Sequence, residues 1–130
     1  MLLFYSSFVF LTNVATTLYK KHFLYSFLFF MLSITSLVNH YDPTPYTTRV
    51  DQVFVAAVVL YGGWVFYNKL PADPLQVAAV VAAFLLTAYL YTYGFCTQQY
   101  CFHCDKTVGD QYHCLLHLVA SFGHHLIVFL

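Results

Sequence analysis

Long runs of apolar residues alternate with short polar stretches along the whole chain. A membrane-spanning helix needs about 20 predominantly apolar residues, with about 17 as the lower limit. The runs that fit this pattern cover residues 2–19, 23–39, 52–67, 75–95 and 111–130. The first and third are the weakest, the first because it contains Asn13 and several threonines. The pattern predicts an all-α membrane protein with five transmembrane helices, forming a single integral membrane domain over residues 1–130.

The polar stretches between the runs hold nearly all of the charged residues and all four prolines. Only 8% of the residues are charged and 61% are hydrophobic, whereas soluble domains have about 25% charged residues. The formal net charge is zero, so no basic surface suits a nucleic acid. Lys20 and Lys21 follow the first apolar run instead of preceding it. We therefore expect a retained first span and not a secretory signal.

The basic residues are shared unequally between the two membrane faces. Loops after the first and third spans carry Lys20, Lys21 and Lys69, and loops after the second and fourth carry Arg49 and Lys106. The positive-inside rule then makes the first of these faces cytoplasmic. We expect a multi-pass protein of the endoplasmic reticulum, the Golgi or the cell surface.

Five polar residues are predicted to lie at one depth in the membrane. Ser36 and His40 are four residues apart near the end of the second span, and Asp51 opens the third. His113 and His117, again four apart, begin the fifth span on the same face. Residues spaced i, i+4 share one side of a helix. Because ionisable residues in a membrane are costly and usually face the bundle interior, we expect these side chains to converge.

Three histidines in this arrangement suit a zinc ion. Three imidazoles and an open fourth position are typical of catalytic zinc, which makes water more acidic and polarises carbonyl groups. The candidate ligands are His40, His113 and His117, and their nitrogens must reach a common point within about 4 Å. Asp51 is a candidate base for the water, and Ser36 a candidate donor to a developing oxyanion. The predicted reaction is hydrolysis of an amide or ester in an acylated lipid.

Other interpretations of these residues are open. A histidine near a membrane interface is often a polar anchor, and a serine in a span often bonds the carbonyl one turn back. The chain would then be a non-catalytic subunit of a larger membrane assembly, or a receptor or fusion factor that keeps a structural metal. Histidines on facing helices would also admit a haem, although this leaves Ser36 and Asp51 unexplained.

The order Ser36-x-x-x-His40, Asp51 eleven residues later, and an HxxxH pair in the last span resembles the CREST superfamily of membrane proteins. That superfamily includes alkaline ceramidases, lipid-remodelling proteins of GPI anchors, and progestin and adiponectin receptors. The loop HYDPTPYTTRVD and the segment DQYHCLLHLVA are most similar to the GPI-remodelling branch. The resemblance implies that His40, His113 and His117 bind zinc, that Ser36 and Asp51 complete the site, and that the substrate is a ceramide-type amide or a GPI or phospholipid ester.

The chain departs from that superfamily in its number of spans. CREST proteins have a seven-helix core, whereas five spans are predicted here. Loss of one helical hairpin preserves the face from which each remaining span starts, so the polar residues can still meet in a compact CREST-like bundle. A second copy or a partner subunit would then complete the lipid chamber, or the activity has been lost.

Four cysteines and a further pair of histidines lie near or in the last span. The segment CFHC resembles half of a zinc knuckle, but a second close pair is missing, and on a lumenal face disulfides are favoured. The cysteines are Cys96, Cys101, Cys104 and Cys114. His124 lies about 20° around the helix from His113, and an interior hydrogen bond is favoured for it over a proton relay. Gly62 and Gly63 predict close helix contact.

Overall fold

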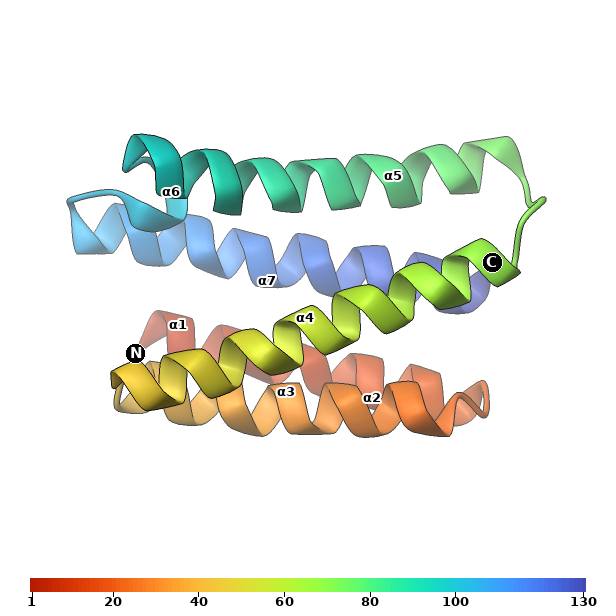
Figure 1. The fold of residues 1–130 in the computed structure, drawn as a ribbon, viewed down its shortest axis with the longest axis horizontal. Helices are drawn as coiled ribbons and strands as arrows, with labels where there is room; N and C mark the ends of the chain where they lie inside the picture. The colour runs from red at the N-terminus through yellow and green to blue at the C-terminus, as the bar shows by residue number, and fades with distance from the viewer.

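A computed structural model describes residues 1–130 as a bundle of antiparallel helices without strands (Figure 1). Five of its helices are long and apolar enough to cross a membrane, and each matches one predicted span. The N- and C-termini lie at opposite ends of the bundle. The predicted all-α class and the five spans are confirmed at this level.

The first helix is continuous but changes hydrogen-bonding type along its length, and the fourth contains a π-helical turn. The elements are α1 (Leu2–Ser6), η1 (Ser7–Val9), α2 (Phe10–Tyr19), α3 (Phe23–Tyr41), α4 (Pro45–Asn68), α5 (Pro74–Ala88), η2 (Tyr89–Tyr93), α6 (Gly94–Thr97), η3 (Tyr100–Phe102) and α7 (Lys106–Phe129).

Helices α4 and α7 begin earlier than the apolar runs predicted. Thr44 accepts a hydrogen bond from the backbone of Thr47, whose side chain accepts one in return from the backbone of Thr44, and Pro45 occupies the first helical turn. Asp105 caps α7 in a similar way. Such caps satisfy the free N–H groups of a polar first turn, which hydropathy alone overlooks. Asp51 therefore lies inside α4, and the prediction that it opens the helix was wrong.

The same correction applies to α7. Its HxxxH pair starts at His113, two turns after Lys106, and not at the beginning of the helix. At about 1.5 Å per residue, His113 lies about 10 Å along the helix axis from Lys106. The pair thus lies inside α7 and not at its first turn.

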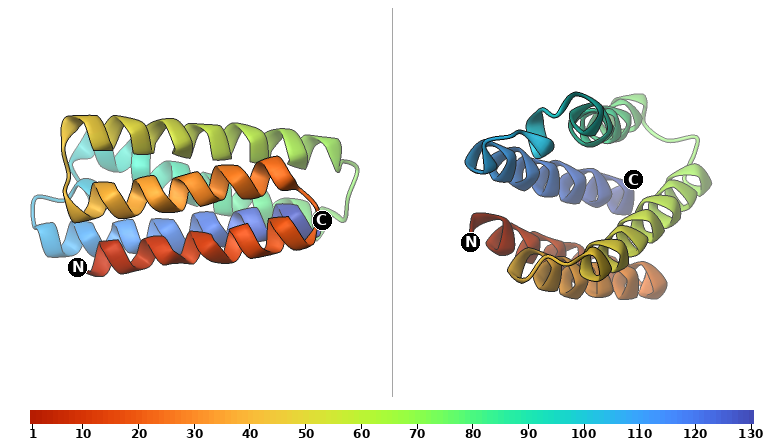
Figure 2. Two further views of the ribbon diagram at one scale, coloured as in Figure 1. Left: turned by 90° about the horizontal axis from the view of Figure 1, so that it is seen from below. Right: turned by 60° about the vertical axis from the view of Figure 1, so that its left-hand side comes forward.

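The helices pack in an open arrangement around α7 (Figure 2). The continuous first helix lies against α3, and α3 against α4, while α7 contacts the first helix, α4 and α5. Helix α5 contacts α7 but not α2, α3 or α4. The apolar core lies mainly between α3 and α4, where Tyr25, Phe29, Leu32, Val58 and Val65 are buried.

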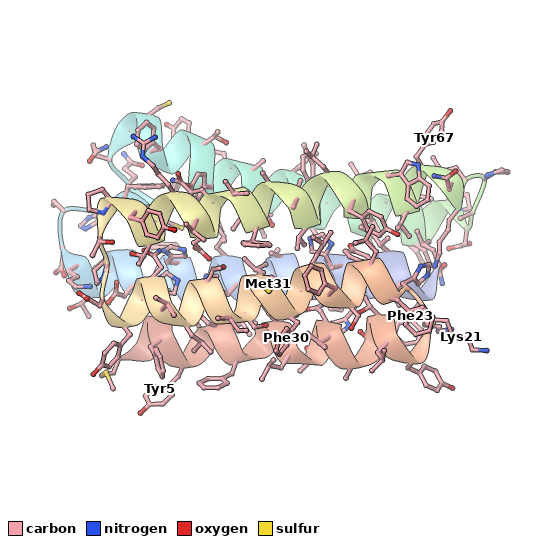
Figure 3. All side chains as sticks on the ribbon, turned by 60° about the horizontal axis from the view of Figure 1, so that its bottom comes forward. Tyr5, Lys21, Phe23, Phe30, Met31 and Tyr67 are labelled. Carbon is pink, nitrogen blue, oxygen red and sulfur yellow. The ribbon has the colours of Figure 1, made fainter.

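Large apolar side chains cover the outside of the bundle. Tyr5 and Tyr67 project outward in Figure 3, and Phe23 and Trp64 are also exposed. In water such a surface would be a strong liability, whereas acyl chains cover it without cost. The structure is therefore compatible with a multi-pass membrane protein.

Candidate metal centre

Three histidine side chains meet at the end of the bundle where α3 ends and where α4 and α7 begin. His40 comes from the last turn of α3, and His113 and His117 from successive turns of α7. Their ring centroids are 5.2 Å apart for His40 and His113, 5.3 Å for His40 and His117, and 4.9 Å for His113 and His117. One ring nitrogen from each lies within 4.8 Å of the other two.

The helix directions explain this meeting. Helix α3 runs toward this end of the bundle and α7 runs away from it (Figure 1). The last turn of α3 can therefore lie at the depth of the third and fourth turns of α7. The i, i+4 spacing then turns both α7 histidines to one side. Phe10 of the first helix packs on His117, with ring centroids 5.0 Å apart.

The three nitrogens fit a zinc ion. Three atoms no more than 4.8 Å apart share a point within about 2.8 Å of each, which is 4.8 Å divided by the square root of three. Zn–N bonds measure about 2.0–2.1 Å, so each ring would move by less than about 1 Å to bind. This meets the 4 Å requirement set by the sequence prediction.

The hydrogen bonding of His40 agrees with a ligand role. Its Nε2 atom is buried and has no hydrogen-bond partner. A buried polar atom without a partner costs about 1–3 kcal/mol, and a bound cation would remove that cost. His117 is also buried, with 4% of its surface exposed. The donor set of three imidazoles, the geometry and the orphan nitrogen together fit zinc.

Ser36 is buried one turn before His40 on α3. Ser7 donates a hydrogen bond to its hydroxyl, with the two Oγ atoms 3.2 Å apart. Ser7 is the one hydrogen-bond partner of this side chain. Ser7 Oγ also lies 3.3 Å from the Leu3 carbonyl oxygen, so the Ser36 hydrogen is available for donation when Ser7 gives its single hydrogen to Ser36 and not to Leu3.

Asp51 lies on the seam between α3 and α4, with 9% of its surface exposed. Its Oδ1 atom accepts a hydrogen bond from Thr35 Oγ1 at 3.1 Å. Asn39, one turn after Thr35, accepts from Thr47 and Thr48 at 3.2 and 2.9 Å. No hydrogen bond joins Asp51 to the three histidines. The structure therefore brings the predicted ligands together, and holds Asp51 on the adjacent side of α3.

Ser6 is a site residue that sequence reasoning missed. Its Oγ lies 2.8 Å from His117 Nδ1, which links the first helix to the histidine cluster. Ser6 and Ser7 interrupt the apolar run LLFYSSFVF, and this pair of hydroxyls was the available sign. It was overlooked because a serine in a span usually bonds only its own helix.

The other histidines of α7 have ordinary partners. His124 Nδ1 is hydrogen-bonded to the Tyr25 hydroxyl, which confirms the interior hydrogen bond favoured from sequence. His125 pairs with Thr12 through Nε2 at 2.9 Å and with Thr16 through Nδ1 at 3.0 Å. These rings therefore pack and bond within the bundle, and neither joins the metal-type cluster.

The four cysteines are free thiols in the structure. The disulfides favoured from sequence are not formed. The cysteines also do not join His103 in a group that could hold a metal. The loop expected around them is partly helical, since Cys96 lies in α6, Cys101 in η3 and Cys114 in α7.

The fold and the site together define an all-helical bundle, compatible with a membrane, with a cluster of three histidines near one end, of which His117 is buried and His40 and His113 are half-buried. No protein-family model, curated protein or solved structure matches the chain. The resemblance to the CREST superfamily therefore stays a prediction.

Proposed function

We propose that this protein is a zinc-dependent intramembrane hydrolase of acylated lipids, a compact five-helix relative of the CREST enzymes. The observation that carries the proposal is the cluster of His40, His113 and His117, with one nitrogen from each within 4.8 Å of the others and an unpartnered Nε2 on His40. A satisfied packing cluster would not leave a buried ring nitrogen without a partner.

The three histidines would hold the ion, which supplies an acidified water and a Lewis acid for a carbonyl group. Asp51 is the proposed general base. Thr35 donates a hydrogen bond to its Oδ1 atom, and its carboxylate would take a proton from the attacking water. The Ser36 hydroxyl accepts from Ser7 and donates its own hydrogen to the oxyanion that forms on the carbonyl. The products are a fatty acid and a deacylated lipid.

The depth of the site supports a lipid substrate. His40 is in the last turn of α3, and His113 lies about 10 Å along α7 from its start. The amide and ester linkages of membrane lipids lie at a similar level, between the headgroups and the hydrocarbon core. Helix α4 does not pack on α5, and one hydrogen bond, from Gln52 Nε2 to the Tyr91 hydroxyl at 3.4 Å, joins α4 to η2. A lipid would approach from the bilayer between α4 and α5.

Residence in the endoplasmic reticulum, the Golgi or the cell surface, with the site toward the lumenal or exoplasmic face, is part of this proposal. It rests on the excess of basic residues at the opposite face, where Lys20, Lys21 and Lys69 lie.

The first experiment is metal analysis of the detergent-purified protein, followed by hydrolysis assays on ceramide, GPI-anchor and phospholipid substrates. We expect near-stoichiometric zinc. Asp51→Asn should keep the zinc and lower hydrolysis by about 10²–10⁴-fold, the usual contribution of a general base. Asp42→Asn is the matched control, since Asp42 is an exposed acid at the same end of the bundle. Wild-type protein without zinc would overturn the proposal.

One observation favours a second candidate, a component of a larger membrane assembly. Helix α5 packs on α7 alone and presents Leu75, Phe84 and Leu85 outward. A second copy or a partner subunit seated there would also complete the wall of a lipid chamber. Native mass spectrometry after gentle detergent extraction distinguishes a monomer from either complex.

A further inference from the structure

The hydroxyl of Ser6 lies between a backbone carbonyl and the ring of His117. Its Oγ atom is 2.8 Å from the carbonyl oxygen of Leu3 and 2.8 Å from His117 Nδ1. Both distances are those of good hydrogen bonds. The hydrogen atoms shared among the Leu3 carbonyl, the Ser6 hydroxyl and the His117 ring can therefore be assigned one by one.

A serine hydroxyl has one hydrogen to donate and two lone pairs that accept. The Leu3 carbonyl can only accept, so the bond to it uses the hydroxyl hydrogen. The contact to His117 then requires the ring to donate from Nδ1. In a neutral imidazole this leaves the lone pair on Nε2.

We propose that Ser6 is a positioning residue that fixes His117 as the Nδ1–H tautomer and thereby leaves Nε2 as its metal-binding atom. Metal-bound histidines commonly donate their second ring N–H to such a partner, which sets the tautomer and the ring orientation. The tautomer rests on hydrogen bonding alone, and the metal-binding consequence rests on the function proposed above.

The first helix restrains the ring in a second way. Phe10, one turn after Ser6, packs on His117 with ring centroids 5.0 Å apart and planes inclined at 57°. His117 is buried, so the ring has little freedom to turn. Ser6 and Phe10 thus give the first helix, which carries no proposed ligand, a role in orienting one.

The test reads the tautomer in metal-free protein. The protein, labelled with ¹⁵N in its histidines and held in detergent micelles, gives the protonated nitrogen of each ring from long-range ¹H–¹⁵N correlation spectra. His117→Gln assigns the His117 signals. We expect Nδ1–H in the wild type, a shift toward Nε2–H in Ser6→Ala, and retention of Nδ1–H in Ser6→Thr, which keeps the hydroxyl.

Ser33→Ala is the matched control. Ser33 is buried on α3, and its hydroxyl donates only to the Phe29 carbonyl of its own helix, at 2.8 Å. The Ser33→Ala variant loses the same hydroxyl group as Ser6→Ala, but from a residue that has no hydrogen bond to His117. The control should leave the His117 tautomer unchanged.

Zinc competition titrations on the same variants measure the second half of the proposal. Loss of such a partner typically weakens metal binding about 10–100-fold. We expect this loss in Ser6→Ala, near wild-type affinity in Ser6→Thr, and no change in Ser33→Ala.

The two proposals fail in different ways. Nε2–H in wild-type His117, or Ser6→Ala with an unchanged tautomer, overturns the role of Ser6 whether or not zinc binds. Nδ1–H in a wild-type protein that binds no zinc overturns the hydrolase proposal and leaves the tautomer assignment standing. An unchanged zinc affinity in Ser6→Ala overturns the metal-positioning role.

Discussion

Helix α7 carries two histidine pairs at different depths, and their surroundings differ. The first pair, His113 and His117, faces His40, and all three rings offer nitrogens toward one another. The second pair, His124 and His125, lies in the last two turns of α7 and faces hydroxyl groups of the first helix and of α3. The ring nitrogens of His113 and His117 converge with a nitrogen of His40. Those of His124 and His125 are hydrogen-bonded to separate hydroxyl groups.

This difference shows how histidines that bind a metal can be distinguished from histidines that only pack, in a bundle that contains both. A histidine that packs is bonded by a neighbour of complementary type, such as the Tyr25 hydroxyl at His124. A ligand histidine is left with a nitrogen that no protein group satisfies, as His40 Nε2 is. His113 and His117 are four residues apart and His124 and His125 are adjacent, but spacing alone does not show which ring nitrogen has a partner, so the hydrogen-bond partners separate the two pairs.

Replacing one histidine of each pair by alanine tests this difference most directly. His113→Ala should abolish stoichiometric zinc binding, because two imidazoles are a poor zinc site. His124→Ala should keep the zinc and lower the free energy of unfolding by about 1–3 kcal/mol, because it leaves the Tyr25 hydroxyl buried without a partner. Metal analysis and thermal unfolding in detergent measure the two effects. Equal loss of zinc in both variants would erase the distinction between the two pairs.

The glycines of α4 test, by size, the space beside His124. A Cβ atom at Gly62 would clash with the Tyr25 hydroxyl and would lie 2.8 Å from ring atoms of His124. Tyr25 is fully buried and packs against Phe29 and Tyr61, so it cannot move aside freely. Overpacking of this kind typically costs about 1–3 kcal/mol. Gly62→Ala should therefore lower the unfolding temperature measured in detergent.

Gly63→Ala is the control for that variant. Nothing lies within 4 Å of a Cβ atom at Gly63, and alanine favours a helix by about 1 kcal/mol over glycine. Gly63→Ala should leave the protein equally or more stable. Similar destabilisation by both variants would show that the helix, and not the contact with Tyr25 and His124, is sensitive.

The sequence contained enough to predict the helices and the meeting of the three histidines. Apolar run length predicts spans because a bilayer requires each to satisfy its own backbone. The depth of His40 and the i, i+4 spacing of His113 and His117 then follow from helix geometry. Close contact at Gly62 was also predicted correctly, whereas Gly63 faces open space.

The failures have two physical causes, polar helix ends and tertiary packing. The capped first turns of α4 and α7 are polar, so hydropathy placed Asp51 and His113 too near the helix ends. The hydrogen bond from Thr35 to the Asp51 carboxylate was not predicted, because depth does not fix the rotation of α4 about its axis. Ser6 was missed because its partner, His117, is far away in the sequence. Tertiary packing determines both the rotation of a helix about its axis and the pairing of residues far apart in the sequence, and neither can be read from a single sequence.

Asn13 and Ser121 form a neutral pair about one turn of α7 before His124, and the strength of their hydrogen bonds can be measured. Asn13 Nδ2 donates to the Ser121 carbonyl at 3.0 Å, and Ser121 Oγ donates to Asn13 Oδ1 at 2.5 Å. Both residues are buried. Hydrogen bonds between membrane helices are worth about 0.6 kcal/mol on average, with a maximum of about 1.7. A double-mutant cycle of Asn13→Ala and Ser121→Ala should give a coupling free energy in this range, and a value near zero would contradict it.

His125 should contribute least, although it makes two hydrogen bonds. Its partners are the exposed Thr12 and the half-buried Thr16, and each keeps another acceptor when the ring is removed. Thr12 Oγ1 also lies 2.6 Å from the Val9 carbonyl, and Thr16 Oγ1 3.1 Å from the Thr12 carbonyl. No hydroxyl is left unsatisfied, so His125→Ala should change the free energy of unfolding by less than about 0.5 kcal/mol. Detergent unfolding of His125→Ala beside His124→Ala measures this. A cost for His125→Ala equal to that for His124→Ala would mean that the number of hydrogen bonds, and not the orphaned partner, determines what each histidine contributes.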